Sequence, residues 1–336
     1  MKVGIVAPSV MPINDSLAYG GTEGVIKNLI EAVKDHCDVT LIAPIGSKLE
    51  GVNVIETVKP EMRWVLEDET YNIYKKCLTD FDVINSHEHS GQVYKFFSEK
   101  PDPKIIHCFH GLQTWPMLPN AKAWNFVVLS EFHKQDCVRK YGTLPNYSII
   151  PHGIALSDFV YEPHKSDYFL HYGLVALHKG HDISLAVTKK ANVMLCVAGE
   201  HQFVSDTDYV NKVLIECAKR NVEFLGRTTQ EKKIELFKKA RAVILPFKIG
   251  EAFSLIAIEC LATGTPVITS NIGAMPEIVE HGKTGFLCNN SDEFVEAIKN
   301  IDKINPMDCR RSAEERFDRK LMAKRYLEQY ERLVKT

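Results

Sequence analysis

Residues 246–287 read PFKIGEAFSLIAIECLATGTPVITSNIGAMPEIVEHGKTGFL, and this stretch decides the fold class. A buried strand is predicted to end at Leu245, and a loop that carries Glu251 follows it. Ser254 is placed to cap a helix that runs to Thr263, and Gly264 closes this helix. Strand, loop, helix and a further apolar run in this order predict a parallel α/β unit.

The same alternation extends to both ends of the chain. Short apolar runs alternate with helical patterns up to about residue 150, and the rhythm restarts after it. Two α/β domains are therefore predicted, with a linker over residues 156–166 and a terminal helix that packs through Phe317, Leu321, Tyr326, Leu327, Tyr330 and Val334. The predicted strands are residues 2–7, 38–43, 82–86, 104–109 and 125–129, then 168–173, 193–198, 222–225, 242–245 and 266–269.

The composition of the 336 residues argues against several other classes of protein. Apolar residues make up 45% and charged residues 25%, which is unlike a disordered or fibrous chain. The 41 Lys and Arg nearly balance the 43 Asp and Glu, so charge gives no case for a nucleic-acid partner. Glu259 interrupts the longest apolar run, so no transmembrane segment is predicted, while peripheral membrane contact stays open. Nine scattered cysteines without a Cys-x-x-Cys pair indicate reduced thiols and a cytoplasmic protein.

The start of the predicted helix after Ser254 offers backbone donors to a ligand. The N–H groups of Ser254 and Leu255 suit a diphosphate, because the positive end of the helix dipole lies there. Glu259, inside an apolar run, is placed to accept two hydrogen bonds from a vicinal diol. A Glu259 that faces solvent on an amphipathic helix is the alternative, and both interpretations stay open at this point.

Gly20-Gly21-Thr22-Glu23 precedes another helical pattern and forms a second candidate site. Two glycines let the backbone approach a ligand closely, and a helix start supplies N–H groups for an anion. A simple flexible turn is the alternative. The chain contains no Gly-x-Gly-x-x-Gly, so a nicotinamide-dependent dehydrogenase loses its main support.

Taken together, these motifs resemble the retaining nucleotide-sugar glycosyltransferases of family 4. Glu251 and Glu259, with seven residues between them, are followed by Gly-Thr-Pro-Val-Ile, Pro-Glu-Ile-Val and Gly-Lys-Thr-Gly-Phe-Leu. The glycine pair and residues 151–154 and 173–180 resemble further segments of that family, so the similarity covers most of the chain.

The resemblance implies a GT-B architecture, with two Rossmann-like parallel-sheet domains that face a central cleft. Residues 1–155 would form the acceptor-side domain, together with a crossing helix over 317–336. Residues 156–316 would form the domain that binds the nucleotide sugar.

The same resemblance assigns roles to residues of the second domain. Glu259 would bind the ribose hydroxyls, and Glu251 would contact the hydroxyls of the transferred sugar. Ser254 and Leu255 would donate backbone N–H groups to the diphosphate, and Lys179 would supply a cation. Fixed donors and a cation stabilise the negative charge that grows on the leaving diphosphate.

Two residues of the first domain receive roles in the same way. His110 would face the sugar and would be the second catalytic residue, in addition to Glu251. Gly21 would let the backbone approach the donor phosphates or the acceptor. By residue type alone, His110 is equally well a satisfied histidine at a strand end.

One position departs from the family pattern. Leu174 stands where the family usually has Arg, so half of the cationic clamp on the diphosphate is missing. A lost charge-assisted hydrogen bond costs about 1.5–3 kcal/mol. We expect Lys248 or Arg227 to supply the charge instead.

No metal site and no cofactor are predicted. His87-Glu88-His89 lacks further ligands at a recognisable spacing. Cys108 and Cys260 are interpreted as small buried side chains rather than as nucleophiles.

The predicted reaction is transfer of a hexose-type sugar from a nucleotide diphosphate sugar to a hydroxyl acceptor, with retention of the anomeric configuration. The acceptor is a glycan, a lipid or a small molecule. Two alternatives stay open: a non-transferring nucleotide-sugar enzyme such as an epimerase, and a catalytically silent module that binds a nucleotide or a glycan.

Overall fold

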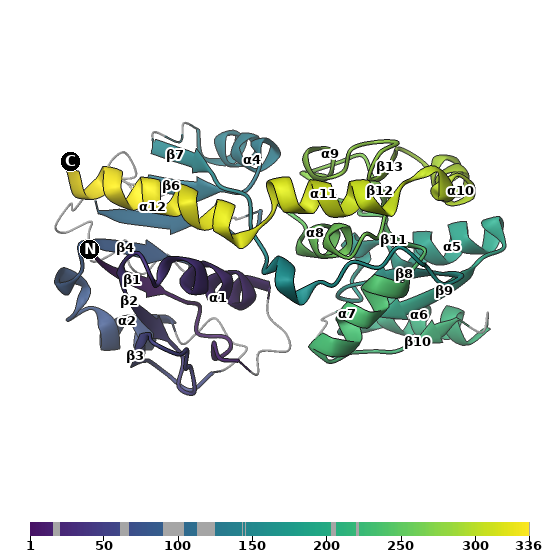
Figure 1. The fold of residues 1–336 in the computed structure, drawn as a ribbon. Coiled ribbons are helices and arrows are strands. Elements are labelled where there is room, and N and C mark those ends of the chain that lie inside the picture. The colour runs from purple at the N-terminus through teal and green to yellow at the C-terminus, as the bar shows by residue number, and fades with distance from the viewer. Residues whose placement is uncertain are drawn as a thin grey trace. The chain divides into compact units, whose positions relative to one another are not determined.

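The computed structural model describes residues 1–15, 21–60, 67–89, 104–112, 125–142, 144, 146–202, 206–219 and 222–335. The chain separates into two compact units (Figure 1). Unit 1 contains Met1–Ile154 and Arg319–Thr336, and unit 2 contains Ala155–Asp318. Each unit has its own parallel sheet with helices around it, which confirms the predicted fold class.

The described residues of unit 1 form a seven-stranded parallel sheet in the order β3-β2-β1-β4-β5-β6-β7. The order reverses between β1 and β4, and ligands of such sheets bind outside the carboxyl ends of the strands at this point. The strands are β1 (Lys2–Val6), β2 (Asp38–Ala43), β3 (Asn53–Glu56), β4 (Val83–Ser86), β5 (Ile105–Cys108), β6 (Asn125–Val128) and β7 (Asn146–Ile149). The helices are α1 (Gly21–Val33), α2 (Glu67–Tyr74), α4 (Glu131–Tyr141) and α12 (Arg319–Lys335).

The described residues of unit 2 repeat this topology with six parallel strands in the order β10-β9-β8-β11-β12-β13. Here the order reverses between β8 and β11, so the loops after these two strands are the place to look for a ligand site. The strands are β8 (Tyr168–Tyr172), β9 (Met194–Ala198), β10 (Glu223–Phe224), β11 (Ala242–Leu245), β12 (Val267–Ser270) and β13 (Gly285–Cys288). The helices are α5 (His181–Ala191), α6 (Thr207–Lys219), α7 (Gln230–Lys239), α8 (Leu255–Ala262), α9 (Met275–Ile278), α10 (Ser291–Lys299) and α11 (Pro306–Arg316).

The ten predicted strands are present, but three others were not predicted. These are β3, β7 and β13, and each lies at an edge of its sheet. Residues of β3 and β7 are half-buried or exposed, whereas those of β4, β5 and β6 are buried throughout. β3 and β7 therefore lack the continuous apolar run by which a buried parallel strand is found. β13 is apolar but has only four residues and begins with glycine, which is uncommon in strands.

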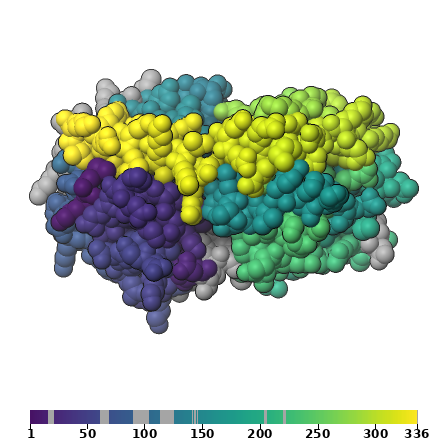
Figure 2. All heavy atoms as spheres, in the orientation of Figure 1, coloured from purple at the N-terminus to yellow at the C-terminus, as the bar shows by residue number. Residues whose placement is uncertain are grey.

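The terminal helix α12 packs on α1 and β4 of unit 1. On the face drawn in Figure 2, the yellow end of the chain lies beside its purple beginning. The expected packing face was partly wrong, because Leu321 and Val334 are 37% and 44% exposed and Met322 and Leu333 are buried instead. The helix begins only at Arg319, since α11 ends just before Phe317.

Residues 156–166 do not form a free linker. The N–H group of Glu162 donates to the carbonyl of Thr263, and the N–H group of Ser166 donates to that of Lys239. Phe159 is buried, and its carbonyl accepts a hydrogen bond from Arg310. The segment is thus a packed part of unit 2.

Candidate functional site

In unit 2, the loop after β11 leads directly into helix α8. Ser254 caps this helix, and its hydroxyl accepts a hydrogen bond from the N–H group of Ala257 at 3.3 Å. This confirms the predicted cap and helix start. The N–H groups at the beginning of a helix have no partner within the helix, so Ser254 and Leu255 present donors and a positive dipole end at this point.

Glu251 lies in that loop beside Lys179, which follows β8. The Lys179 Nζ donates to Oε1 of Glu251 at 2.9 Å, and both side chains are about one-fifth exposed. An ammonium group has three N–H donors, so Lys179 can hold Glu251 and also contact an anion. The carboxylate and the cation expected at the donor site are therefore neighbours in the structure.

Two glycines allow these loops to approach each other. Gly180 has a φ of +74°, and a Cβ there would lie 2.0 Å from the carbonyl oxygen of Pro246. Gly273 has a φ of +64°, and a Cβ there would lie 2.4 Å from the backbone nitrogen of Glu251. Any other residue at either position would push the Glu251 loop away from its neighbours.

Glu259 lies on the second turn of α8 and is only 9% exposed. Its Oε1 accepts a hydrogen bond at 2.9 Å from Nζ of Lys233 on α7. The alternative of a solvent-facing Glu259 on an amphipathic helix is therefore wrong. A buried carboxylate is stable only with a partner, and Lys233 supplies it.

The cations proposed to replace the missing Arg at Leu174 both have carboxylate partners. Lys248 Nζ donates to Oδ2 of Asp182 at 2.8 Å, and Arg227 lies 3.8 Å from Oε2 of Glu200. Neither arrangement tests whether these residues contact a diphosphate, so the compensation stays a prediction.

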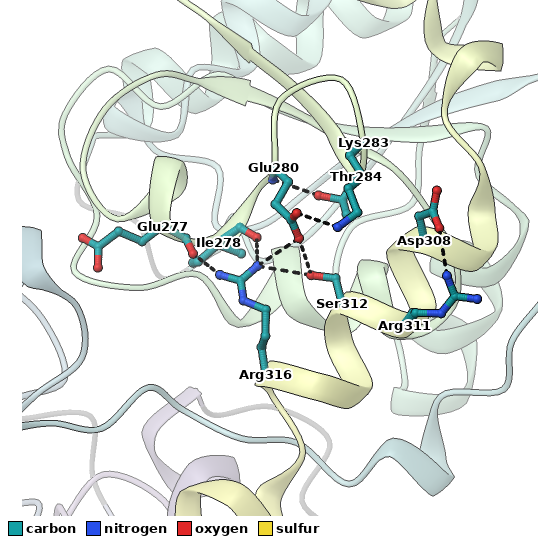
Figure 3. Close-up of polar contacts among 9 residues, drawn as sticks. All are labelled: Glu277, Ile278, Glu280, Lys283, Thr284, Asp308, Arg311, Ser312 and Arg316. Carbon is teal, nitrogen blue, oxygen red and sulfur yellow. Dashed lines mark hydrogen bonds and ion pairs between the residues drawn. The ribbon is translucent and has the colours of Figure 1, made fainter.

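Arg316 holds helix α9, which follows β12 and contacts the Glu251 loop. At the end of α11, its guanidinium donates to the carbonyls of Glu277 and Ile278, which end helix α9, and it lies 3.7 Å from Glu280 (Figure 3). The N–H group of Ala274, the residue before α9, donates to the carbonyl of Glu251 at 2.9 Å. Arg316 therefore fixes the far end of the short helix whose near end supports Glu251.

In unit 1, His110 follows the end of β5 and contacts two other histidines. Its Nε2 lies 2.8 Å from Nδ1 of His87, and its ring stacks on His152 with centroids 5.1 Å apart. Burial lowers the pKa of His110 well below its usual value and that of His87 to about 3. Both imidazoles are therefore neutral at pH 7.

Gly21 is the first residue of α1, and Gly20 lies outside the described residues. Gly21 is exposed and stands at the N-terminal end of the helix, where backbone N–H groups lack helical partners. The expected anion-binding role of this helix start stays a prediction.

The two cysteines next to site residues are buried thiols. Cys108 is 1% exposed and Cys260 is fully buried. Burial raises the pKa of Cys108 to about 12 and that of Cys260 well above its usual value. Neither thiol ionises at neutral pH without an added charge beside it, which agrees with the interpretation as small buried side chains.

Sequence reasoning missed three features of these sites. Lys233 pairs with Glu259 from a separate helix, and Arg316 supports α9 from a distant part of the chain. His87, Cys108 and His110 bring one ligand atom each to within 4.8 Å of one another. All three features depend on tertiary contacts, and only the known register of parallel strands could have suggested the third.

Two protein-family models match the chain, one for each half of the sequence. The model for "Glycosyltransferase Family 4" matches residues 19–158, and the model for "Glycosyl transferases group 1" matches residues 156–316. The chain belongs to glycosyltransferase family 4. It is a GT-B glycosyltransferase that takes its sugar from a nucleotide-sugar donor.

Individual relatives are distant. An uncharacterised glycosyltransferase of Methanocaldococcus jannaschii is 24% identical over 328 residues, which is 92% of this chain and 91% of the relative. A glycogen synthase of Mycobacterium tuberculosis is 33% identical over 131 residues, but these cover only 37% of this chain and 30% of that enzyme. The structure of Anabaena HepE in complex with UDP-glucose matches with a TM-score of 0.75 at 17% identity. The match covers 98% of this chain and 99% of the HepE chain. At this identity the structural likeness shows the fold alone.

None of the helices that the structure describes is long and apolar enough to span a bilayer. All nine cysteines lie among the described residues, and each is free.

Proposed function

We propose that this glycosyltransferase moves a hexose from a uridine diphosphate sugar to a hydroxyl acceptor with retention of the anomeric configuration. One observation carries the proposal: two lysine–carboxylate pairs lie at the start of α8. Glu251, paired with Lys179, is in the loop before the helix, and Glu259, paired with Lys233, is on its second turn. This arrangement offers a cation and backbone donors for a diphosphate, with a carboxylate on either side for hydroxyl groups. The HepE complex with UDP-glucose makes UDP the first nucleotide to test.

In the proposed site, unit 2 binds the donor. The Glu259 carboxylate accepts hydrogen bonds from the ribose hydroxyls, while the hydrogen bond from Lys233 holds this carboxylate in place. Ser254, Leu255 and Lys179 contact the diphosphate. Glu251 accepts hydrogen bonds from hydroxyl groups of the transferred sugar.

The proposed step needs no covalent intermediate. The bond between the anomeric carbon and the diphosphate oxygen breaks, and the acceptor oxygen bonds to the same face of that carbon. The acceptor proton passes to an oxygen of the leaving diphosphate. The growing charge on the diphosphate is stabilised by the N–H groups of α8 and by Lys179, which are fixed before the reaction begins.

The acceptor is assigned to unit 1, with the neutral His110 as the residue that faces the sugar. A neutral imidazole can donate from one nitrogen and accept at the other, so it can hydrogen-bond a sugar hydroxyl without adding charge. The start of α1 at Gly21 is assigned to the donor phosphates or the acceptor.

Turnover with UDP-hexoses and a panel of hydroxyl acceptors tests the proposal. UDP release is measured, and proton NMR of the product reports the anomeric configuration. We expect α-linked donors to give α-linked products, and Glu251→Gln to lower kcat about 100-fold or more while the matched variant Glu235→Gln on the exposed face of α7 does not.

Other outcomes would point to a different function. An inverted product or a trapped glycosyl-enzyme would contradict the proposed step. A rearranged sugar without acceptor would indicate an epimerase. Binding of UDP without transfer from any donor tested would indicate a silent binding module.

A further inference from the structure

Unit 1 contains a cluster of three metal-binding side chains that the proposed reaction does not need as a set. His87 directly follows β4, Cys108 ends β5, and His110 lies two residues further on. One ligand atom from each of the three lies within 4.8 Å of the others. His87 and Cys108 are almost completely buried.

The register of the two strands explains why the three residues meet. β4 and β5 are parallel neighbours, with Ser86 paired to His107. The next step along both strands brings His87 level with Cys108, and side chains at the same level of neighbouring strands lie on the same face. His110 is two residues after Cys108, so it returns toward this face.

A second, independent observation concerns the far nitrogen of His87. Nδ1 of His87 lies 2.8 Å from Nε2 of His110, but Nε2 of His87 is buried and has no hydrogen-bond partner among the residues that the structure describes. A buried polar atom without a partner is costly. In the metal-free protein, His87 therefore makes a hydrogen bond only through the nitrogen that faces His110.

We propose that His87, Cys108 and His110 bind a zinc ion. Two imidazoles and one thiolate are donors that Zn²⁺ prefers, whereas Mg²⁺ and Ca²⁺ require oxygen ligands. Three protein ligands leave the fourth position of a tetrahedral ion open for water or for a hydroxyl group.

The geometry requires a small adjustment. With Zn–N bonds of about 2.1 Å and tetrahedral angles, two coordinating nitrogens stand about 3.4 Å apart, so the imidazoles separate by about 0.6 Å if the ion enters between the facing nitrogens. The ion takes the place of the hydrogen bond between the two rings, and each neutral imidazole then carries its one proton on the nitrogen that faces away from the ion, Nε2 of His87 and Nδ1 of His110. The Cys108 thiol also releases its proton to solvent, and the charge of the ion stabilises the buried thiolate.

The consequence for turnover rests on the proposed function. His110 is the residue proposed to face the sugar, and an imidazole bound to zinc no longer offers that nitrogen to a hydroxyl group. Zinc is therefore expected to inhibit transfer, and a chelator is expected to restore it. Metal binding itself does not depend on the proposed function.

Cobalt is the probe, because Co²⁺ occupies zinc sites and a thiolate ligand gives it a charge-transfer band in the near ultraviolet. The full chain is titrated with Co²⁺ and then with competing Zn²⁺. We expect one ion per chain with a thiolate band and a tetrahedral visible spectrum. Cys108→Ser should abolish the thiolate band, and His87→Gln should weaken affinity about 100-fold. The matched variant Cys137→Ser, at an equally buried thiol of unit 1, should behave as the wild type.

The spectra decide the proposal whether or not turnover is found. Absence of a thiolate band in the folded wild type overturns it, and so does a band that persists in Cys108→Ser. If Cys108→Ser does not fold by circular dichroism, His87→Gln decides, because unchanged cobalt affinity in that variant also overturns it. Inhibition by zinc without the thiolate band would place the ion elsewhere. A thiolate band without any sugar transfer would leave the metal site standing and remove the proposed function.

Discussion

At the scale of single residues, each of the two carboxylates proposed for the donor site has a lysine beside it. Lys179 and Lys233 lie 2.9 Å from Glu251 and Glu259. These lysines reduce the repulsion between the carboxylates and an incoming diphosphate. Lys179 was predictable because it stands within a motif. Lys233 was not, because its contact with Glu259 joins two helices across 26 residues of sequence.

The first prediction at this scale concerns the cation that replaces the arginine missing at Leu174. We expect Lys248→Ala or Arg227→Ala to weaken UDP binding about tenfold, because a charge-assisted hydrogen bond of about 1.5–3 kcal/mol is partly offset by breaking the pair with Asp182 or Glu200. Calorimetric titration of UDP measures this, with Lys232→Ala at an exposed position of α7 as the control. If both variants bind UDP like the wild type, neither residue replaces the missing arginine.

At the scale of helices and strands, burial determines what the sequence can reveal. The central strand β11 is buried throughout and reads as a continuous apolar run. The edge strands β3 and β7 carry exposed or half-buried residues and polar side chains, and they were missed. Helix α8 was predictable from Ser254 and Gly264, because capping is a local interaction. The support of α9 by Arg316 is a tertiary contact and leaves no local pattern.

Arg316 gives the prediction for this scale. Arg316→Met should lower the free energy of unfolding by about 1–3 kcal/mol, because two carbonyls at the end of α9 and the Glu280 carboxylate lose a charged donor. Urea unfolding followed by far-UV circular dichroism measures the change. Arg311→Met is the control on the same helix, since the Arg311 side chain is 60% exposed and pairs with Asp308 (Figure 3). Equal stability of the two variants would show that Arg316 does not hold α9.

At the scale of the whole molecule, buried histidines are concentrated in unit 1. Burial lowers the pKa of His87, His107 and His152 to about 3 and that of His89 and His133 to about 4, and lowers that of His110 as well. In unit 2, the pKa of His171, His178 and His181 is lowered. The two units should therefore respond differently to acid.

The sign of this response follows from proton linkage. An unfolded histidine takes up a proton below about pH 6.5, whereas these folded histidines take it up only at lower pH because burial lowers their pKa, so stability falls as the pH drops below about 6.5. The loss grows with the number of such histidines, and six are in unit 1 but three in unit 2. Unit 1 should therefore unfold at a higher pH than unit 2.

The sequence supplies a direct readout for this prediction. All three tryptophans of the sequence, Trp64, Trp115 and Trp124, fall within the residue range of unit 1 and outside the described residues. Tryptophan fluorescence thus follows unit 1, while far-UV circular dichroism follows both units. On acid titration, the dichroism should change in two steps. The fluorescence should change together with the first step, at the higher pH, and not with the second. Coincident transitions would contradict the predicted difference between the units.

The claim that α8 and its two carboxylates bind the donor is tested most directly by calorimetric titration of UDP and 2′-deoxy-UDP into the wild type and Glu259→Gln. The account predicts that the wild type binds UDP about tenfold or more tightly than the deoxy analogue, and that Glu259→Gln removes most of this difference while Glu235→Gln keeps it. Equal affinities of the wild type for the two nucleotides, or an unchanged preference in Glu259→Gln, would contradict it.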